Sequence, residues 1–326
     1  MSRKATESHI GEKTLQVVVM GGLGFIGSHL SRALLQDNYR VRIFDKLYAS
    51  RDLIHDIEQD VEVIEGDVER VEDVLQCLED ADIAINLIHT TVPGSSMEDP
   101  AHDALSNVVS STRWLSRLNE TDLKRLIYIS SGGTVYGVPL YNPITEEHPT
   151  EPMCSYGITK LAGEKYTAMY AKLNGVEYRI CRPANIYGEG QLLNIGQGVI
   201  GVFLERALKG KPIEIWGDGT NRRDYLYVKD MIDAVMKLMR HEEQERVFNI
   251  STGMGYSLND IVRIIREELN IPVKVSYKST RGFDVPENIL SSKRLQNETG
   301  WKGTIGLVEG MRRVYESLKR DVIIQI

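Results

Sequence analysis

Apolar and polar residues follow a regular succession of short apolar runs and longer amphipathic stretches that begins at Leu15. Short apolar runs bounded by turn residues are typical of buried strands, and longer stretches with helical spacing are typical of helices. The predicted strands are 15–20, 40–44, 61–64, 83–88, 126–130 and 177–181, and the predicted helices are 26–36, 71–78, 99–119 and 153–174. Strands that alternate with helices predict a doubly wound, parallel α/β sheet that is covered on both faces.

The regular alternation ends near residue 182. A loop-rich stretch at 188–201 follows, and then a predicted helix at 203–209 and a short strand at 213–216. The pattern predicts a flexible extension at 1–14, a first domain at 15–182, and a smaller C-terminal α/β lobe at 183–326 with returns to the first domain.

Composition excludes several classes of function. The chain has 326 residues, of which 26% are charged, and its net charge of −7 argues against a nucleic-acid binder or a protein drawn to anionic membranes. Three scattered cysteines predict neither a disulfide framework nor a metal site, which fits a reducing compartment. Because 1–14 contain no apolar signal region and no run reaches the roughly 18 residues of a spanning helix, we expect a cytoplasmic protein without membrane partners.

The first turn after the first strand carries the clearest chemical signal. Gly21, Gly24 and Gly27 have the spacing G-x-x-G-x-x-G between a strand and a helix, with Phe25 and Ile26 inside the motif. The first glycine permits a tight turn, the second lets a pyrophosphate approach the backbone, and the third lets helix and strand pack closely. In this context the motif predicts a Rossmann-type dinucleotide site, whereas a glycine turn without a ligand is the weaker alternative.

Two acidic residues follow the next strands. Asp45 ends the second strand, where a carboxylate binds the ribose hydroxyls of NAD and repels the 2′-phosphate of NADP. The nearby Lys46 and Arg51 weaken this preference without reversing it. Asp67, followed by Val68, ends the third strand, and it either lies beside the adenine or caps the next helix.

Motifs along the whole chain from residue 15 resemble those of one family. They are Gly21-x-x-Gly24-x-x-Gly27, Asp67-Val68, Asn107, SSGGTVYG at 130–137, Tyr156-x-x-x-Lys160, RPANIYG from Arg182, GDGTNRRDYLYVKD from Gly217, and RGFDVP from Arg281. Their order resembles the extended short-chain dehydrogenases/reductases, specifically the NAD-dependent epimerase/dehydratase family, and is similar to UDP-glucose 4-epimerases. The resemblance implies bound NAD and a nucleotide-sugar substrate, with UDP as the commonest nucleotide.

Tyr156 and Lys160 are the candidate catalytic pair. Four residues apart on a helix, they share one face. An ammonium near a phenol favours the phenolate, so we expect Lys160 to lower the pKa of Tyr156 and to make it a general base for a sugar hydroxyl. The resemblance implies that Lys160 also holds the nicotinamide ribose.

The resemblance assigns further residues to the two ligands. Cofactor contacts are expected from Leu87, Ile88, His89, Asn107, Ser130 and Pro183, and substrate contacts from Asn185, Arg223, Arg281 and Asp284. Arg222 competes with Arg223 for the diphosphate, and ion pairing with Asp224 is the alternative for Arg223. His89 is unusual at a position where the family often has a small residue, and we expect a packing or cofactor-edge role.

The reaction class depends on Gly132 and Gly133. Dehydratases of the family carry an Asp-Glu pair at these positions, so the resemblance disfavours water elimination. It favours an NAD-dependent UDP-hexose 4-epimerase that works through a transient 4-keto sugar. An NAD(P)H-dependent 4-keto-sugar reductase is the alternative, and the intact Tyr156 and Lys160 pair argues against a non-catalytic regulator.

The hydroxyl partner of Tyr156 stays open between two residues. The family's catalytic Ser or Thr falls at Gly132, which has no hydroxyl, so either the adjacent Ser131 or Thr134 takes this role. Adjacency favours Ser131, whereas the alternation of side chains along a strand favours Thr134.

The resemblance also implies a homodimer that pairs through the helix of Tyr156. Its apolar positions Ala162, Tyr166, Met169 and Leu173 are candidates for that seam or for the core of the subunit itself. The identity of the sugar depends on the loops at 90–96 and 190–199, whose shape the sequence does not determine.

Overall fold

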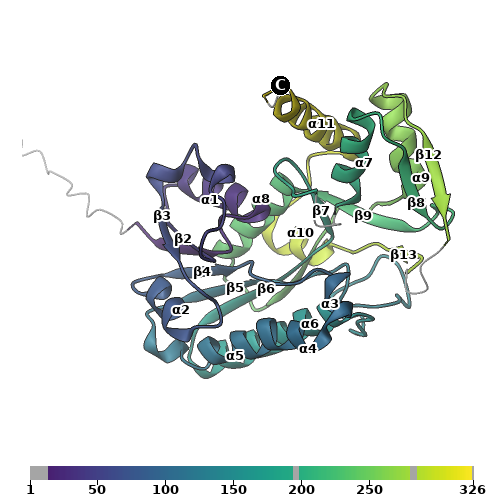
Figure 1. The fold of residues 1–326 in the computed structure, drawn as a ribbon. Coiled ribbons are helices and arrows are strands. Elements are labelled where there is room, and N and C mark those ends of the chain that lie inside the picture. The colour runs from purple at the N-terminus through teal and green to yellow at the C-terminus, as the bar shows by residue number, and fades with distance from the viewer. Residues whose placement is uncertain (1–13, 194–197, 280–284, 325–326) are drawn as a thin grey trace, which may run out of the picture.

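The structure, a computed structural model, describes residues 14–193, 198–279 and 285–324 (Figure 1). A central parallel sheet carries helices on both faces, and a smaller lobe lies beside it. Nearly all of the predicted extension, together with Arg281 and Asp284, lies outside the described residues.

The central sheet has seven strands in the order β10-β6-β5-β4-β1-β2-β3. All neighbouring pairs are parallel. The strands are β1 (Gln16–Met20), β2 (Arg40–Asp45), β3 (Glu62–Glu65), β4 (Ile83–Asn86), β5 (Arg125–Ile129), β6 (Glu177–Pro183) and β10 (Val247–Ile250). This arrangement confirms the predicted doubly wound fold, in which the strand order reverses beside β1.

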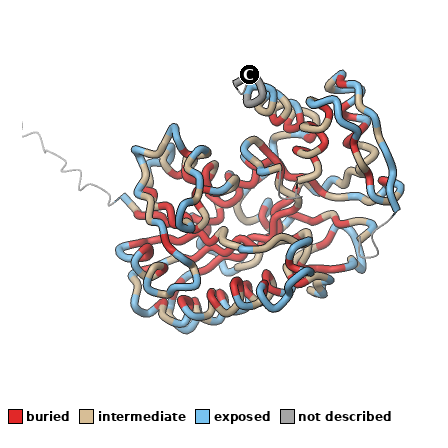
Figure 2. The backbone as a smooth tube through the Cα atoms, viewed as in Figure 1, coloured by how far each residue is buried: buried red, intermediate tan, exposed pale blue. Residues whose placement is uncertain are grey.

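Burial on both faces explains why β1 reads as an unbroken apolar run. Val17 and Val19 belong to the core on one face of the sheet, whereas Val18 and Met20 belong to the core on the other face. Successive side chains of a strand point to opposite faces, so a strand covered on both sides has no polar face. Figure 2 shows the buried residues concentrated along this sheet.

Two helical layers cover the sheet. α1 (Phe25–Gln36) packs beside α8 (Val228–Arg240) on one face. The opposite layer contains α2 (Val71–Leu78), α3 (Ser95–Glu98), α4 (Pro100–Asp103), α5 (Ser110–Leu115) and α6 (Ser155–Leu173) (Figure 1). The predicted helix at 99–119 is interrupted by a π-helical segment, Ala104–Val109. Such segments occur often at functional sites.

The smaller lobe is built around β9 (Arg222–Tyr227). It pairs with β7 (Asn185–Tyr187), β11 (Gly255–Ser257) and β13 (Glu287–Asn288), and a separate parallel pair joins β8 (Ile213–Trp216) to β12 (Val275–Lys278). The helices of this lobe are α7 (Val199–Leu208), α9 (Leu258–Arg263) and α11 (Leu307–Ile324). α10 (Lys293–Thr299) packs on β10, which itself joins the central sheet although it comes late in the chain.

Candidate active site

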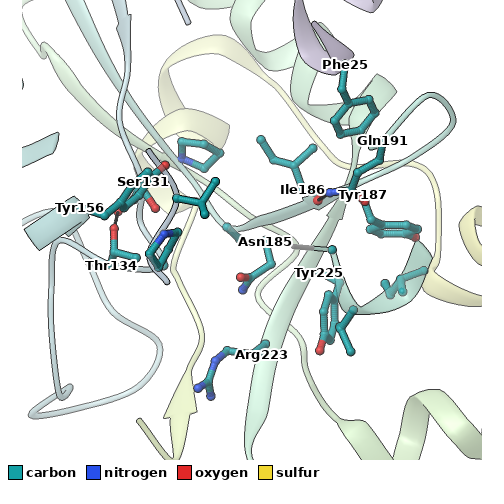
Figure 3. A pocket seen from close by; sticks show the side chains of 18 of the residues that line it. Phe25, Ser131, Thr134, Tyr156, Asn185, Ile186, Tyr187, Gln191, Arg223 and Tyr225 are labelled. Atoms are coloured by element: carbon teal, nitrogen blue, oxygen red, sulfur yellow. Dashed lines mark hydrogen bonds between the residues drawn. The ribbon is translucent and has the colours of Figure 1, made fainter. Parts of the chain in front are cut away.

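A cavity of about 770 Å³ lies between the sheet and the smaller lobe (Figure 3). Its walls come from the carboxyl ends of β5 and β6, the segment after β4, the start of α6, and β7, β8 and β9. Ligands of doubly wound sheets bind at this edge. Of the predicted site residues, those that line the cavity are Phe25, Ile26, Leu87, His89, Ser130, Ser131, Thr134, Tyr156, Lys160, Pro183, Asn185 and Arg223.

The glycine turn leaves no room for a side chain at its third glycine and leaves the backbone at its second glycine open. Gly21 has φ +86°, and a Cβ on Gly27 would lie 2.3 Å from the carbonyl oxygen of Gly21. A Cβ on Gly24 would meet only that same oxygen, at 3.4 Å. No side chain caps the start of α1, and its first turn carries no acidic residue. An uncapped helix start with a bare backbone in front of it suits the pyrophosphate of NAD.

Asp45 lies at the end of β2, beside the glycine turn. Its two carboxylate oxygens accept hydrogen bonds from the backbone N–H groups of Leu23 and Lys46, each at 2.9 Å. Arg51 donates to Glu58 at 2.9 Å and to Glu65 at 2.8 Å. Because these two carboxylates already balance the positive charge of Arg51, Arg51 does not offset the negative charge of Asp45 that a 2′-phosphate would meet.

Asp67 does not cap α2. Its carboxylate accepts a hydrogen bond from the N–H of Glu69 at 2.9 Å, and the N-cap position of α2 is Arg70. Of the two alternatives from the sequence, the helix cap is therefore wrong. The adenine contact of Asp67 and Val68 stays a prediction.

The segment after β4 connects the glycine turn to the cavity. β4 ends at Asn86, so Leu87 and Ile88 lie beyond the strand, where both pack close to Gly21. Leu87 lines the cavity, whereas Ile88 packs against the core. Asn107 is buried, and its side chain accepts a hydrogen bond from Thr90 N at 2.9 Å. It therefore supports the wall of the cavity from behind.

Tyr156 and Lys160 enter the cavity from the first turns of α6. Ser131 is hydrogen-bonded to the Tyr156 phenol, and the two side chains lie side by side in Figure 3. Lys160 is 3% exposed, and its ammonium donates to the carbonyl of Ile129 at 2.8 Å. The Nζ atom lies 5.9 Å from the centroid of the Tyr156 ring.

The pKa of Tyr156 differs from the sequence prediction. Burial raises this pKa well above its usual value, and the Cys154 thiol (when ionised at high pH) and the Asp103 carboxylate add to the shift, against the hydrogen bond from Ser131. Burial also lowers the pKa of Lys160 to about 7, although Glu164 and Asp103 oppose this shift. The prediction that Lys160 lowers the pKa of Tyr156 is therefore wrong for this arrangement, because the ammonium is directed to a backbone carbonyl.

Ser131, rather than Thr134, contacts the Tyr156 phenol. The hydroxyl of Thr134 lies 3.5 Å from the carbonyl oxygen of Ser131 and donates to it. Both side chains still line the cavity. The geometry therefore favours Ser131 as the partner, as adjacency in the sequence suggested.

The two glycines of the same segment have different surroundings. A Cβ on Gly132 would lie 2.3 Å from Leu290 Cδ1 and 2.9 Å from the carbonyl oxygen of Arg182. A Cβ on Gly133 would meet nothing closer than 3.6 Å, and Gly133 lines the cavity. Room for a ligand therefore comes from Gly133, whereas Gly132 is required by packing.

The far end of the cavity carries the predicted substrate residues. Asn185, on β7, donates to the carbonyl of Asp224 at 3.1 Å. Arg223 lines the cavity from β9 (Figure 3), together with Trp216 and Phe203. Arg222 is directed away from it, since its guanidinium donates to the carbonyl of Gly255 at 2.6 Å.

Asp224 is buried and organises the loop behind Arg223. Its carboxylate accepts hydrogen bonds from the hydroxyl and N–H of Thr252 and from the N–H of Gly253, at 2.7–3.1 Å. Burial raises the pKa of Asp224 to about 6, and these hydrogen bonds oppose the shift. Asp224 therefore holds the backbone of this loop, and it is fully buried rather than at the surface.

A sequence profile of the NAD dependent epimerase/dehydratase family matches residues 17–251. The chain belongs to this family. A putative UDP-glucose 4-epimerase of Methanocaldococcus jannaschii is 34% identical over 308 residues, which are 94% of this chain and 99% of the relative. The crystal structure of a Thermotoga maritima UDP-glucose 4-epimerase with UDP-glucose is similar, with a TM-score of 0.88 and 30% identity over 94% of this chain and 100% of that one.

One similar protein is named as a reductase rather than an epimerase. A dTDP-4-dehydro-6-deoxyglucose reductase of Escherichia coli is 30% identical over 311 residues, which are 93% of this chain and 97% of the relative. The family is NAD-dependent, which confirms NAD as the predicted cofactor. In the part of the chain that the structure describes, no helix is long and apolar enough to cross a membrane. The same residues hold no group of three or more metal-ligating side chains.

One buried ion pair of this epimerase/dehydratase family member was missed by sequence reasoning. Glu164, one helical turn beyond Lys160, accepts hydrogen bonds from Arg182 at 2.9 and 2.6 Å and from the hydroxyl of Ser130. Arg182 also donates to the phenol of Tyr136 at 2.9 Å. The Ser130 hydroxyl, predicted to contact the cofactor, is therefore held by Glu164. The spacing of Glu164 after Lys160 was the available signal.

Proposed function

We propose that the protein is a UDP-hexose 4-epimerase that works through a transient 4-keto sugar, with Tyr156 as general base and acid. The observation that carries the proposal is the hydrogen-bonded pair of Tyr156 and Ser131, which faces the same cavity as Lys160 and the start of α1. NAD, when bound, accepts a hydride from the sugar and returns it.

Tyr156 takes the proton of the sugar C4 hydroxyl and later returns it. Ser131 favours the phenolate form of Tyr156, which is the form that Tyr156 needs before it can take this proton. Lys160, anchored on the carbonyl of Ile129, keeps a cation in the same buried region. Because burial disfavours the phenolate, Tyr156 depends on Ser131 and on the positive charge that oxidised nicotinamide would bring.

The site does not suit water elimination. A dehydratase needs acidic side chains near the sugar to move protons between carbon atoms, and the segment between Ser131 and Thr134 carries two glycines instead. Packing against Leu290 leaves no room for a side chain at Gly132. The open surface of Gly133 instead provides space in which a 4-keto sugar can turn before it is reduced on its other face.

The far end of the cavity suits a nucleoside diphosphate. Arg223 offers forked N–H donors, which match the geometry of phosphate oxygens. Trp216 and Phe203 offer aromatic surface for a base and ribose. UDP is proposed as the nucleotide because the similar epimerases are named for UDP-glucose. The predicted contacts of Arg281 and Asp284 remain proposals.

A homodimer through the exposed face of α6 is part of the proposal. Tyr166, Met169 and Leu173 are 37%, 41% and 72% exposed, so these apolar side chains do not pack in the subunit's own core. Analytical ultracentrifugation of Leu173→Glu beside the parent chain tests this seam, and an unchanged sedimentation coefficient would exclude it. A cytoplasmic location stays a prediction from composition.

The reductase is the second candidate, and the relative from Escherichia coli favours it. Purified protein incubated with UDP-glucose, UDP-N-acetylglucosamine or UDP-glucuronate, without added nicotinamide, separates the two. Formation of the 4-epimer, together with NAD released on denaturation, supports the epimerase. Stoichiometric consumption of NAD(P)H with a 4-keto sugar, and no epimer from any donor, would replace it with the reductase.

A further inference from the structure

His89 forms part of the wall against which Tyr156 lies. The two ring centroids are 4.5 Å apart, and the ring planes meet at 72°. The side chain of His89 is only 7% exposed, and it lines the cavity on the same side as Tyr156. Edge-to-face contacts of this kind are directional, so the histidine ring restricts where the tyrosine ring can lie.

Asp103 fixes the position of His89. The imidazole Nε2 lies 3.6 Å from Asp103 Oδ1 and 3.5 Å from the hydroxyl of Thr159. Asp103 is fully buried, and it also accepts hydrogen bonds from Thr91 at 2.5 Å and from Ser155 at 2.6 Å. One carboxylate thus joins the segment after β4 to the first turn of α6, which carries Tyr156.

The charges around this cluster keep Asp103 ionised and His89 neutral. Burial alone would raise the pKa of Asp103, but the nearby His89 imidazole and the hydrogen bonds from Ser155 and Thr91 hold it well below its usual range. Burial and the Lys160 ammonium lower the pKa of His89 to about 4, against the opposing effect of Asp103. A neutral imidazole adds no charge beside Tyr156, and its low pKa means that the imidazolium form is not available as an acid near neutral pH.

From this geometry we infer that His89, held by Asp103, is a positioning residue for Tyr156. It fixes the tyrosine ring so that the phenol oxygen meets the reacting hydroxyl from one direction. The inference rests on the proposed function, because it gives His89 a part in that reaction. A displacement of about 1 Å at a reacting group can cost about a hundredfold in rate, so a support of this kind has a large effect.

Three substitutions at His89 separate the properties of the side chain. His89→Ala removes the ring, His89→Phe keeps a ring without Nε2, and His89→Gln keeps a hydrogen-bonding group without a ring. His102→Ala is the matched control, since His102 is an exposed histidine on the same short helix as Asp103. If His89→Ala fails to fold, judged by thermal unfolding, His89→Gln carries the test.

The expected kinetic result is a fall in kcat of about 10- to 100-fold in His89→Ala, with KM for the nucleotide sugar within about threefold of the parent. His89→Phe is expected to regain most of kcat with an unchanged pH profile. His102→Ala is expected to match the parent. A kcat of His89→Ala within about twofold of the parent, or a raised KM alone, overturns the inference. So does a His89→Phe variant that is as slow as His89→Ala and loses one limb of the pH profile, because that assigns proton transfer to His89.

Crystal structures of the parent and of His89→Ala give a readout that needs no turnover. The inference predicts that the Tyr156 phenol oxygen is displaced by about 1 Å or more, or occupies two conformers, in the variant. An unmoved, single Tyr156 conformer overturns it. If the parent chain shows no epimerase activity, the proposed function fails, and the position of Tyr156 still decides the inference.

Discussion

The two ends of the cavity are built in different ways. At the Tyr156 end, the polar side chains are buried and hydrogen-bonded. Asp103 accepts a hydrogen bond from Ser155, and Glu164 accepts one from Arg182. At the Arg223 end, the walls come from short strands of the smaller lobe, and Trp216 is 39% exposed. The first end is buried and held by hydrogen bonds between side chains, whereas the second is partly open to solvent.

This difference follows from what each end has to do. Proton transfer in a short-lived state needs groups held in place before the substrate arrives, and buried networks achieve this. A nucleoside diphosphate needs charge and flat apolar surface, which tolerate small shifts. Substitutions at the Tyr156 end should therefore change kcat, and substitutions at the Arg223 end should change KM.

The largest effect is expected from Tyr156→Phe. Removal of a general base costs about a hundredfold to ten-thousandfold in kcat. The variant should still release NAD on denaturation, because the glycine turn is unchanged. Steady-state assays of epimer formation measure the loss, with Tyr166→Phe on the exposed face of α6 as the control. A Tyr156→Phe variant with near-parental kcat would contradict the claim that substitutions at the Tyr156 end change kcat.

Arg223→Ala tests the open end. The loss of a charge-assisted contact to a diphosphate costs about 1.5–3 kcal/mol, so KM should rise roughly 10- to 100-fold while kcat changes little. The neighbouring Arg222→Ala is the matched control, since the Arg222 guanidinium is directed to the carbonyl of Gly255. Equal effects of the two variants would show that the assignment of Arg223 to the diphosphate is wrong.

Ser131→Ala and Thr134→Ala compare two hydroxyls at the buried end. Ser131 is hydrogen-bonded to the Tyr156 phenol, so its loss should lower kcat by about tenfold, the effect of one hydrogen bond to a developing charge. Thr134 donates only to a backbone carbonyl, and its variant should stay within about threefold of the parent, less than one such hydrogen bond. The reverse order would reassign the partner of Tyr156 to Thr134.

Gly132→Ala and Gly133→Ala compare packing with open space at adjacent positions. The Cβ at 132 would overlap Leu290 and a backbone carbonyl, so we expect a loss of about 1–3 kcal/mol in the free energy of unfolding. Gly133→Ala should unfold like the parent, because its Cβ meets only ordinary contacts. Urea unfolding of both variants measures the difference. Equal stability of the two would contradict the account of Gly132.

The smallest expected effect is the pH dependence that His89 adds to stability. Its folded pKa of about 4 lies below the unfolded value of about 6.5. The folded state therefore disfavours the proton, and this contribution is complete above pH 6.5 and is lost as the pH falls toward 4. Relative to His89→Phe, the parent should lose about 2 kcal/mol of unfolding free energy between pH 7 and 4.5. If the difference in unfolding free energy between the parent and His89→Phe stayed constant across this range, His89 would be protonated as readily in the folded chain as in the unfolded one.

Features that are local in sequence could be predicted, and those that depend on distant contacts could not. The glycine turn and the Tyr156 and Lys160 pair are each set by a few consecutive residues, so their spacing was enough. Asp103 meets Ser155 across 52 residues, and nothing near either residue indicates the other.

The contacts of Gly132 and Lys160 could not be predicted for the same reason. Gly132 is constrained by Leu290, far along the chain, and Lys160 is directed to the carbonyl of Ile129 by the packing of α6 on β5. The alternation of short apolar runs with helical stretches predicted the fold correctly, because a strand that is buried on both faces of the sheet is apolar along its own length.

The fate of the hydrogen on C4 tests the central claim most directly. UDP-glucose deuterated at C4 is incubated with the purified protein without added nicotinamide, and the epimer is analysed by mass spectrometry and NMR. The account predicts UDP-galactose that keeps its deuterium at C4, because the hydride leaves the sugar and returns to the same carbon. Loss of deuterium to solvent, or no epimer from any UDP-hexose and no NAD in the denatured protein, would contradict it.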